Sequence, residues 1–340
     1  MDIKAAIRHL CLKQDLDTDQ MTALMRGIMA GEMTDAQIAA FLVALQLKGI
    51  TANELLGAAT VMRELVTRVE VADKTHLVDT CGTGGTGTDT FNISTAAAMV
   101  VACAGARVAK HGNRGATSKS GSADLLEAAG VKLTLAPDQV AQCIDTVGVG
   151  FMFAPGHHSA MKHVIGPRRE IGVRTIFNLL GPLTNPASAP NQLLGVNDPQ
   201  WIAPMLNVLA SLGSEHVLIV SSEDGLDEIS LSAPTRVGEL QAGVQRHYTI
   251  TPEDFGLRRR QGFAMLQIDD AQQSLALVRA ALAYSNEDAG DIVALNAGAA
   301  LYAANVVSSI AEGVARALEV LKSGAALRKL EELARVSSSM

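Results

Sequence analysis

The first stretch of the chain, up to about residue 70, has hydrophobic and polar positions spaced for helices only. Thr34-Asp-Ala-Gln37 is a capping box, and an apolar run with helical spacing follows it as far as Leu47. Gly49 is placed to end that helix. Thr51-Ala-Asn-Glu54 is a second capping box and starts the next helix. We therefore predict a helical lobe in which these two helices form a compact hairpin.

The helix predicted after Thr34 carries an apolar face that is wider than one packing contact requires. The members of this face are Ala39, Ala40, Leu42, Val43, Leu45 and Leu47. Such a face is buried either within the lobe or against a second subunit, and the pattern leaves both open.

Beyond residue 73, short β-rich runs alternate with helical segments, which is typical of a mostly parallel sheet. The predicted strands are 77–80, 106–109, 131–134, 149–153 and 216–220. The predicted helices between them are 95–104, 123–129, 137–147 and 199–212. More strands and then long amphipathic helices follow as far as Arg335, and the tail Ser337–Met340 is expected to fray.

These patterns predict a chain of the α/β class, with a small all-helical domain and a larger α/β domain whose mostly parallel central sheet is flanked by helices. Residues 1–70 form the helical domain, and residues 71–165 and 193–340 form the α/β domain. A middle segment near 166–192, rich in proline and asparagine toward its end, is expected to re-enter the helical lobe.

Composition and charge narrow the range of functions. Of the residues 48% are hydrophobic but only 3% are aromatic, so the core must be built from aliphatic side chains and methionine. The net charge of −7 argues against a dedicated nucleic-acid binder. The chain has neither an apolar run of bilayer length nor the layout of a signal peptide. Its four cysteines are widely spaced and form no CxxC motif, so we expect reduced thiols and a cytoplasmic protein.

The segment Cys81–Thr95 places four glycines in a short loop between the strand predicted at 77–80 and an alanine-rich helix. A strand, a glycine loop and a helix start rich in hydroxyl groups present main-chain N–H groups to phosphate oxygens. Glycine permits close approach and positive φ angles in such a loop. The spacing matches neither the P-loop nor a dinucleotide fingerprint. The loop therefore predicts a phosphorylated small-molecule ligand, although an ordinary turn has a similar composition.

A second polar segment, Lys110–Ser122, follows the next predicted strand directly. It contains three cations and three glycines, with several hydroxyl groups among them. Ligands of open α/β sheets bind outside the carboxyl ends of neighbouring strands, where both loops are expected to lie. We predict that the two loops hold a polyphosphate between them.

The two loops, Cys81–Thr95 and Lys110–Asp124, resemble the signature loops of the anthranilate phosphoribosyltransferase family. Further similar segments follow in the same order, namely Phe153–Met161, Arg174–Pro186 and Gly225–Ser230. The similarity covers nearly the whole chain. In one departure, the glycine loop of the family usually continues Gly-Gly-Asp, whereas this chain has Thr86 at the third position.

The resemblance implies a fold like that of nucleoside phosphorylases and phosphoribosyltransferases. It also implies transfer of the 5-phosphoribosyl group from 5-phosphoribosyl 1-pyrophosphate to the amine of anthranilate, in L-tryptophan biosynthesis. The products are N-(5-phosphoribosyl)anthranilate and pyrophosphate. The family's properties imply Mg²⁺, two ions per monomer, and a homodimer joined through the helical domain. No catalytic acid or base is assigned, because positioning and the metal are expected to suffice.

By this resemblance, the two loops supply the site for 5-phosphoribosyl 1-pyrophosphate. The glycine loop and the helix start after it would hold the pyrophosphate and ribose portions, and the second loop would hold the remaining phosphate. Lys110 is expected to be a direct charge partner, whereas Lys119 is expected to be exposed. The expected contacts are Gly82, Gly85, Thr86, Thr90, Asn92, Ile93, Ser94, Thr95, Lys110, His111, Gly112, Asn113, Arg114, Gly115, Ala116, Thr117, Ser118 and Ser122.

Loss of pyrophosphate from an anomeric carbon requires stabilisation of charge on the leaving group, which Mg²⁺ and main-chain amides supply well. Mg²⁺ prefers oxygen ligands, and Asp227-Glu228 is an adjacent pair of carboxylates after a predicted strand. Taken alone, such a pair is more often a solvated surface feature. The resemblance favours metal binding and adds Ser94 as a further ligand.

Anthranilate has a carboxylate and a weakly basic amine that is neutral near pH 7, so no strong general base is required. The enzyme instead has to position the ring and its carboxylate, for which arginine is suited. Arg168 and Arg169 are candidates, and the family's Arg-x-x-hydrophobic-Gly pattern selects Arg168. Arg169 is expected to be solvated. The resemblance adds Gly82, Asn113 and His158 to the anthranilate site.

Several reactive side chains have plainer explanations than catalysis. His111 is either a general base or a residue that shapes its loop by hydrogen bonding. His157, His158 and His163 lack acidic or cysteine partners at regular spacing, so a metal cluster is not expected and His158 is expected to line the substrate channel. Cys81 adjoins the glycine loop but has no evident base, so we do not expect it to be a nucleophile.

Two alternatives share the fold. A pyrimidine nucleoside phosphorylase also needs a glycine loop for phosphate, but it has no need of the acidic pair. A nucleic-acid-binding relative is disfavoured by the acidic charge and by the intact Asp227-Glu228 and Lys110–Ser122 segments.

Overall fold

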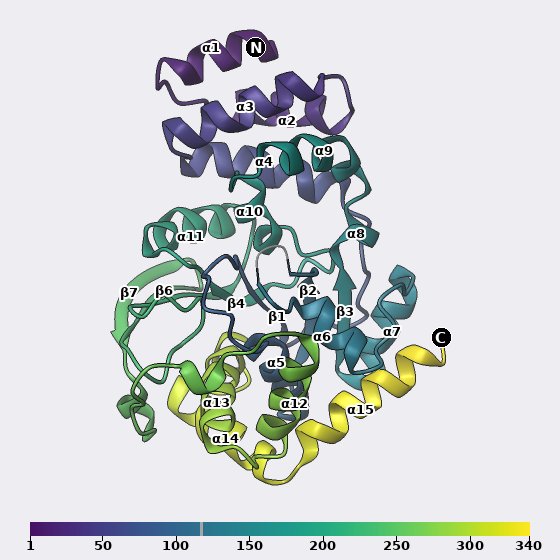
Figure 1. Cartoon of the computed structure of the whole chain (residues 1–340), viewed down its shortest axis with the longest axis vertical. Helices are drawn as coiled ribbons and strands as arrows, with labels where there is room; N and C mark the ends of the chain where they lie inside the picture. Colours follow the sequence, from purple (N-terminus) through teal and green to yellow (C-terminus); the bar gives the residue numbers. More distant parts are fainter. Residues whose placement is uncertain (116–117) are drawn as a thin grey trace.

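The computed structural model describes residues 1–115 and 118–340, which form a helical lobe and a larger lobe built on a sheet (Figure 1). The helical lobe carries the N-terminus, and the chain ends in the sheet lobe. Six helices make up the helical side, namely α1 Ile3–Cys11, α2 Thr18–Met29, α3 Asp35–Lys48, α4 Ala52–Leu65, α9 Lys162–Ile171 and α10 Phe177–Leu180. Helix α9 packs on α2 and α3, and α10 packs on α4, so the middle of the chain returns to this lobe.

Local sequence sets the ends of the N-terminal helices. Thr34 and Gln37 form a reciprocal capping box at the start of α3, and Thr51 and Glu54 form another at the start of α4. Gly49 ends α3 with a φ of 94°. The structure confirms the expected starts of both helices and the end of α3.

The predicted hairpin of α3 and α4 is wrong, because α4 packs mainly on α2 while α3 packs on α1 and α9. Glu54 provides a physical reason. Its fully buried carboxylate accepts the main-chain N–H of Leu16 at 3.0 Å and the ammonium group of Lys48 at 2.9 Å. The bond to Leu16 ties the start of α4 to the segment that precedes α2, and α4 therefore lies against α2. The bond to Lys48 joins the start of α4 to the last residue of α3.

The sheet has seven strands in the order β3-β2-β1-β4-β5-β6-β7. The strands are β1 Leu77–Gly82, β2 Arg107–Gly112, β3 Val149–Phe153, β4 Asn191–Gly195, β5 His216–Ser222, β6 Thr235–Gln241 and β7 Val244–Ile250. The first five in spatial order are parallel, and β6 and β7 continue the sheet antiparallel. The predicted fold class is therefore confirmed. The strand order reverses where β1 meets β4, which is where open α/β sheets bind ligands.

Both faces of the sheet are covered. The helices around the sheet are α5 Ile93–Cys103, α6 Ser122–Ala128, α7 Pro137–Val147, α8 Ala154–His157, α11 Ile202–Ser211, α12 Ala271–Leu282, α13 Glu287–Ala303, α14 Ile310–Lys322 and α15 Ala325–Ser338. Short 3-10 turns lie at Ser159–Met161, Gly181–Leu183, Pro199–Trp201, Pro252–Phe255 and Ala264–Leu266. Along β4, Leu193 packs in the core formed with α5 and α13, whereas Leu194 packs in the core shared with α11 and the helical lobe. Helix α13 crosses α14 at Gly298 and Gly313, where a side chain on Gly313 would strike the Gly298 carbonyl.

The segment 131–134 is not a strand, contrary to prediction. Its donors are already used, because the N–H of Val131 bonds the Leu126 carbonyl at the end of α6 and the N–H of Lys132 bonds Ser337 Oγ at 3.2 Å. Conversely, β4 was not predicted.

Among the described residues, no helix is both long and apolar enough to cross a bilayer.

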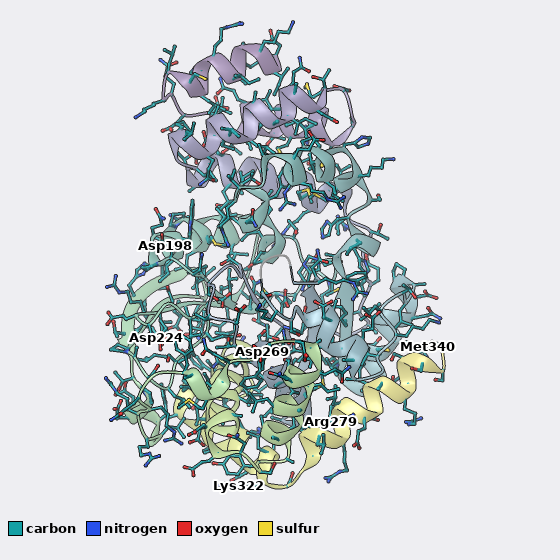
Figure 2. The ribbon with its side chains drawn as sticks, in the orientation of Figure 1. Asp198, Asp224, Asp269, Arg279, Lys322 and Met340 are labelled. Atoms are coloured by element: carbon teal, nitrogen blue, oxygen red, sulfur yellow. The ribbon has the colours of Figure 1, made fainter. Side chains whose placement is uncertain are left out.

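The C-terminal tail is packed, so the expectation that it frays is wrong. Ser337 is fully buried, and Met340 lies beside α7, where its carbonyl accepts the side-chain N–H of Gln139 at 3.0 Å (Figure 2). The side chain of Ser338 also donates to the Gly130 carbonyl at 3.0 Å. Tertiary hydrogen bonds therefore hold a segment that looks like a polar end in the sequence.

Candidate active site

A pocket of about 460 Å³ lies where β1, β2 and β5 end, beside the point at which the strand order reverses. The glycine loop, the start of α5, the second loop and the loop after β5 surround it. Of the residues predicted to bind phosphate, metal or anthranilate, those that line it are Gly82, Gly85, Thr86, Thr90, Asn92, Ile93, Ser94, Thr95, Lys110, His111, Gly112, Asn113, Arg114, Gly115, Ser118, Ser122, Asp227 and Glu228. Ala116 and Thr117 lie outside the described residues.

The glycine loop owes its shape to positive φ angles and to a neighbouring segment. Gly84, Gly85 and Gly87 have φ angles of 60°, 74° and 69°, which favour glycine. A short antiparallel bridge joins Thr90 to Gln267, and the Gln267 side chain donates to the Thr88 carbonyl at 3.0 Å. Within the loop, the hydroxyl groups of Thr86 and Thr88 are 2.8 Å apart. Thr86 thus forms an internal hydrogen bond at the position of the family's aspartate.

Helix α5 begins at the pocket without a side-chain cap from Asn92. The Asn92 side chain instead accepts hydrogen bonds from Ser120 at 2.8 Å and from Ser274 at 2.7 Å. Ile93, Ser94 and Thr95 line the pocket, so the positive end of α5 faces the place where anions are expected.

The carboxylates of Asp227 and Glu228 line the pocket and accept hydrogen bonds from main-chain N–H groups. The N–H of Gly84 donates to Asp227 Oδ2 at 2.9 Å, and the N–H of Ser94 donates to Glu228 Oε1 at 3.1 Å. Burial raises the pKa of Asp227, and burial together with the neighbouring Asp227 raises the pKa of Glu228 to about 8. Two adjacent carboxylates in this state are suited to a bound cation.

The donor set fits Mg²⁺ only if the substrate completes it. The carboxylates of Asp227 and Glu228 and the hydroxyl of Ser94 would supply hard oxygen donors. In the part of the chain that the structure describes, no cluster of three or more His, Cys, Asp or Glu side chains is suited to a metal. Mg²⁺ characteristically binds through one or two carboxylates and the phosphates of a substrate, and this arrangement matches that pattern.

Lys110 is a buried residue of the pocket lining. Its ammonium group donates to the Thr80 carbonyl and, at 3.2 Å, to Ser94 Oγ. Burial lowers the pKa of Lys110, while the nearby Asp79 opposes that shift. Asp79 is itself buried, and it accepts the main-chain N–H of His111 at 3.2 Å. The Lys110 charge is therefore held close to Ser94, at the junction of the two loops.

The second loop is held together by its own charges. Arg114 pairs with Asp124 at 2.9 Å and with Glu127 at 2.7 Å. Asp124 Oδ2 also accepts the main-chain N–H groups of Gly115 and Gly121, each at 2.9 Å. The carboxylates on α6 thus engage the charge of Arg114 and shape the loop.

His111 and His158 form a buried pair whose Nε2 atoms are 3.2 Å apart. His111 Nδ1 lies 3.2 Å from the Gly181 carbonyl, which can only accept, so Nδ1 carries the proton and His111 Nε2 accepts from His158. Burial lowers the pKa of His111 to about 3 and the pKa of His158 to about 4. At neutral pH the lone pair of His111 is therefore engaged, which favours a shaping role over that of a general base.

The other reactive side chains are held apart from one another. His157 Nδ1 lies 2.9 Å from the Thr67 carbonyl, and His163 packs against Gly31. Cys81 Sγ accepts a hydrogen bond from Gln192, and burial raises the pKa of the thiol well above its ordinary value. A protonated thiol of this kind is a poor nucleophile.

Arg168 lies outside the lining of the pocket. Its guanidinium packs over the ring of Phe177 at 5.2 Å, and burial lowers its pKa. Among the described residues no carboxylate pairs with it. Arg169 is exposed.

Sequence reasoning missed Arg174 and Asn178, which both line the pocket. They follow α9 in the segment Arg174–Pro186, which carried part of the family resemblance but received no role. The signal was present in the motif, but only the folded chain brings this segment over the glycine loop.

Both lobes of the chain are similar to known proteins. Residues 4–66 match the helical bundle domain of a glycosyl transferase family, and residues 74–327 match the a/b domain of that family. These matches cover both lobes of the fold and define a glycosyl transferase of this two-domain class. An anthranilate phosphoribosyltransferase from Thioalkalivibrio sulfidiphilus (strain HL-EbGR7) is 58% identical over 100% of this chain and 100% of its own length. The chain belongs to the anthranilate phosphoribosyltransferase family.

Solved structures agree with this assignment. The anthranilate phosphoribosyltransferase of Thermus thermophilus superposes with a TM-score of 0.91 at 43% identity, covering 98% of this chain and 99% of that one. The Saccharomyces cerevisiae enzyme, solved in complex with PRPP (5-phosphoribosyl 1-pyrophosphate) and Mg, shares the fold with a TM-score of 0.89 at 24% identity, covering 99% of this chain and 98% of that one.

Proposed function

We propose that this chain transfers the 5-phosphoribosyl group of 5-phosphoribosyl 1-pyrophosphate to the amine of anthranilate, as an enzyme of L-tryptophan biosynthesis. One observation carries the proposal. In a chain that belongs to this family over its full length, a glycine loop, a helix N-terminus and an acidic pair surround a single pocket. These are the groups that a pyrophosphate leaving group requires.

The phosphorylated substrate would lie across the two loops. Its pyrophosphate would bind the amides of the glycine loop and the start of α5, where Thr90 and Asn92–Thr95 also reach its ribose. Its 5-phosphate would bind the loop Lys110–Ser118 together with Ser122. This orientation is favoured because the acidic pair contacts Gly84 and Ser94, on the glycine-loop side of the pocket.

Asp227, Glu228 and Ser94 would hold Mg²⁺ against the pyrophosphate, and we propose two ions per monomer. The S. cerevisiae enzyme of the same fold was solved with PRPP and Mg, in agreement with this choice of metal. When bound, the metal neutralises charge on the leaving group. The buried ammonium group of Lys110 keeps the Ser94 hydroxyl oriented by the hydrogen bond that it donates to Ser94 Oγ.

Anthranilate would approach from the side of the helical lobe. Arg168 has no carboxylate partner among the described residues, so its guanidinium is available for the substrate carboxylate. Gly82, Asn113 and His158 would complete the site, with His158 acting through His111. The neutral amine then attacks the anomeric carbon as pyrophosphate leaves, and the residues contribute mainly orientation.

We further propose a cytoplasmic homodimer joined through the helical domain. Leu12 at the end of α1 and Leu47 on α3 are 72% and 78% exposed, so the helical lobe presents large apolar side chains at its surface. Ala40 is also exposed, whereas Leu42 and Leu45 of the same predicted apolar face are buried within the lobe. A second copy of the lobe would cover the exposed part. All four cysteines are unpaired, which suits a reducing compartment.

The decisive experiment follows the fluorescence of anthranilate during incubation with the purified protein. We expect a decay that requires both 5-phosphoribosyl 1-pyrophosphate and Mg²⁺. Release of thymine from thymidine with inorganic phosphate would identify a nucleoside phosphorylase instead. A gel shift of single-stranded DNA at physiological salt, without turnover of anthranilate, would identify a nucleic-acid-binding relative.

A further inference from the structure

We propose that Arg174 binds the pyrophosphate of 5-phosphoribosyl 1-pyrophosphate directly and thereby joins the helical lobe to the glycine loop over the leaving group. This inference rests on the proposed function and adds a substrate-binding residue from a part of the chain to which no role was assigned.

Arg174 belongs to the pocket lining and contacts the glycine loop. Helix α9 of the helical lobe ends at Gly172, whose φ is 64°, and Arg174 follows two residues later. Its Nη1 donates to the Gly84 carbonyl at 3.1 Å. Gly85 leaves the space that the guanidinium occupies, because a side chain at that position would collide with Nη1. The loop is thus shaped around this arginine.

The charges of the pocket single out Arg174. Three side chains of the cationic residue types line it, namely Lys110, Arg114 and Arg174. Lys110 is buried and engaged with Thr80 and Ser94, and Arg114 is paired with two carboxylates of α6. Within the described part of the chain, Arg174 makes one hydrogen bond, to a main-chain carbonyl, and no ion pair. A guanidinium has five N–H donors, so most of its donors are free to bind an anion.

The position of Arg174 selects the pyrophosphate rather than the 5-phosphate. Gly84 receives a hydrogen bond from Arg174 at its carbonyl and donates its N–H to Asp227 Oδ2 at 2.9 Å. Arg174 and the acidic pair therefore meet at the same residue of the glycine loop. The second loop, where the 5-phosphate is expected, is instead shaped by Asp124 of α6. A planar guanidinium contacts phosphate oxygens through two donors at once, so Arg174 would stabilise the charge that develops on the leaving pyrophosphate.

The test measures binding of pyrophosphate itself by calorimetry, in the presence of Mg²⁺. We expect Arg174→Ala to bind Mg²⁺-pyrophosphate at least about tenfold more weakly than the wild type. Arg174→Lys keeps the charge but not the fork, so an intermediate loss is expected. Ribose 5-phosphate should bind all variants equally. Arg169→Ala, which removes an exposed arginine from α9 just before this segment, is the matched control and should match the wild type in every measurement.

Steady-state kinetics provide a second measurement. The kcat/KM for 5-phosphoribosyl 1-pyrophosphate should fall in Arg174→Ala, while the KM for anthranilate should stay unchanged. Unaltered pyrophosphate affinity in a folded Arg174→Ala variant would overturn the inference, and so would a loss confined to ribose 5-phosphate. If Arg174→Ala does not fold, the same criteria apply to Arg174→Lys. Failure of the wild type to bind Mg²⁺-pyrophosphate or to consume anthranilate would instead refute the proposed function.

Discussion

The main-chain N–H of Ser94 donates to Glu228 Oε1 at 3.1 Å, although 134 positions separate the two residues in the chain. The Ser94 hydroxyl in turn accepts from the ammonium group of Lys110 at 3.2 Å. This contact brings the first turn of α5, the second loop and the loop after β5 to one point. A buried carboxylate, a hydroxyl group and a helix N-terminus thus meet where we place the metal and the pyrophosphate.

The acidic pair should be essential for turnover. Asp227→Asn with Glu228→Gln keeps the size of both side chains but removes the charge that would bind Mg²⁺, so turnover should collapse while the circular dichroism spectrum stays native. Glu223→Gln, an exposed change in the same loop, is the control. Turnover by the double variant within about threefold of the wild type at saturating Mg²⁺ would refute the proposal that Asp227 and Glu228 bind the metal.

Substitution of Arg168 should impair the use of anthranilate and leave binding of the phosphorylated substrate largely unchanged. We expect Arg168→Ala to weaken the use of anthranilate by about 2–5 kcal/mol, the usual cost of removing one partner of a buried charge-assisted pair. Binding of the phosphorylated substrate should change little. Arg169→Ala should behave as the wild type. If the selective loss occurs in Arg169→Ala instead, the register of the carboxylate site is wrong by one residue.

Thr86 tests the one departure from the family's glycine loop. Its hydroxyl is hydrogen-bonded to that of Thr88 inside the loop, so we expect the glycine amides to bind phosphate without a carboxylate at this position. Thr86→Asp would add a negative charge beside the pyrophosphate. Activity should persist, but the Mg²⁺ optimum or the KM for 5-phosphoribosyl 1-pyrophosphate should shift. Steady-state kinetics of Thr86→Asp and the wild type across a series of Mg²⁺ concentrations measure this shift. A defect selective for anthranilate would mean that this loop binds anthranilate and not the phosphorylated substrate.

The buried histidine pair should make stability depend on pH. The pKa of His158 is about 4 in the folded chain, against 6.5 for ordinary histidine, so between these values the unfolded chain binds a proton that the folded chain excludes. The free energy of unfolding should therefore fall as the pH falls from 6.5 toward about 4. Each such proton contributes a slope of about 1.4 kcal/mol per pH unit. Urea titrations of the wild type and of His158→Asn should show a shallower slope in the variant, and equal slopes would contradict the assignment.

The helical lobe should mediate assembly. Sedimentation should show a dimer at micromolar concentration, and Leu47→Glu should shift it toward monomer by placing a charge in the apolar contact. Val244→Glu, an exposed apolar position on the edge strand β7, is the matched control and should remain dimeric. A monomeric wild type would refute the proposed dimer.

Local features of the fold could be predicted from the sequence because their causes are local. The capping boxes at Thr34 and Thr51 satisfy the first N–H groups of α3 and α4 with side chains only three residues away. The glycines after β1 mark a loop with positive φ, and alternation of strands and helices leads to a parallel sheet. The residues predicted to bind phosphate could be named for the same reason, since most of them lie in two continuous loops that line the pocket.

The tertiary structure decided whatever depends on distant partners. Strand β4 has polar residues at its start and is only five residues long, and it becomes a strand because β1 and β5 pair with it on both sides. The segment 131–134 has β-rich composition, but the end of α6 and Ser337 take its N–H donors, so it cannot join the sheet. Which helix packs on α4 was settled by the buried carboxylate of Glu54, whose partner Leu16 lies 38 residues earlier.

The same division holds within the candidate site. By itself, the sequence determined the two loops and the acidic pair, because residue type and local order carry their chemistry. Only the folded chain placed Arg174 against Gly84, 90 residues away, and joined His158 to His111. Neither contact leaves a periodic or local pattern in the sequence, because each depends on how α9 and the segments on either side of it return across the end of the sheet.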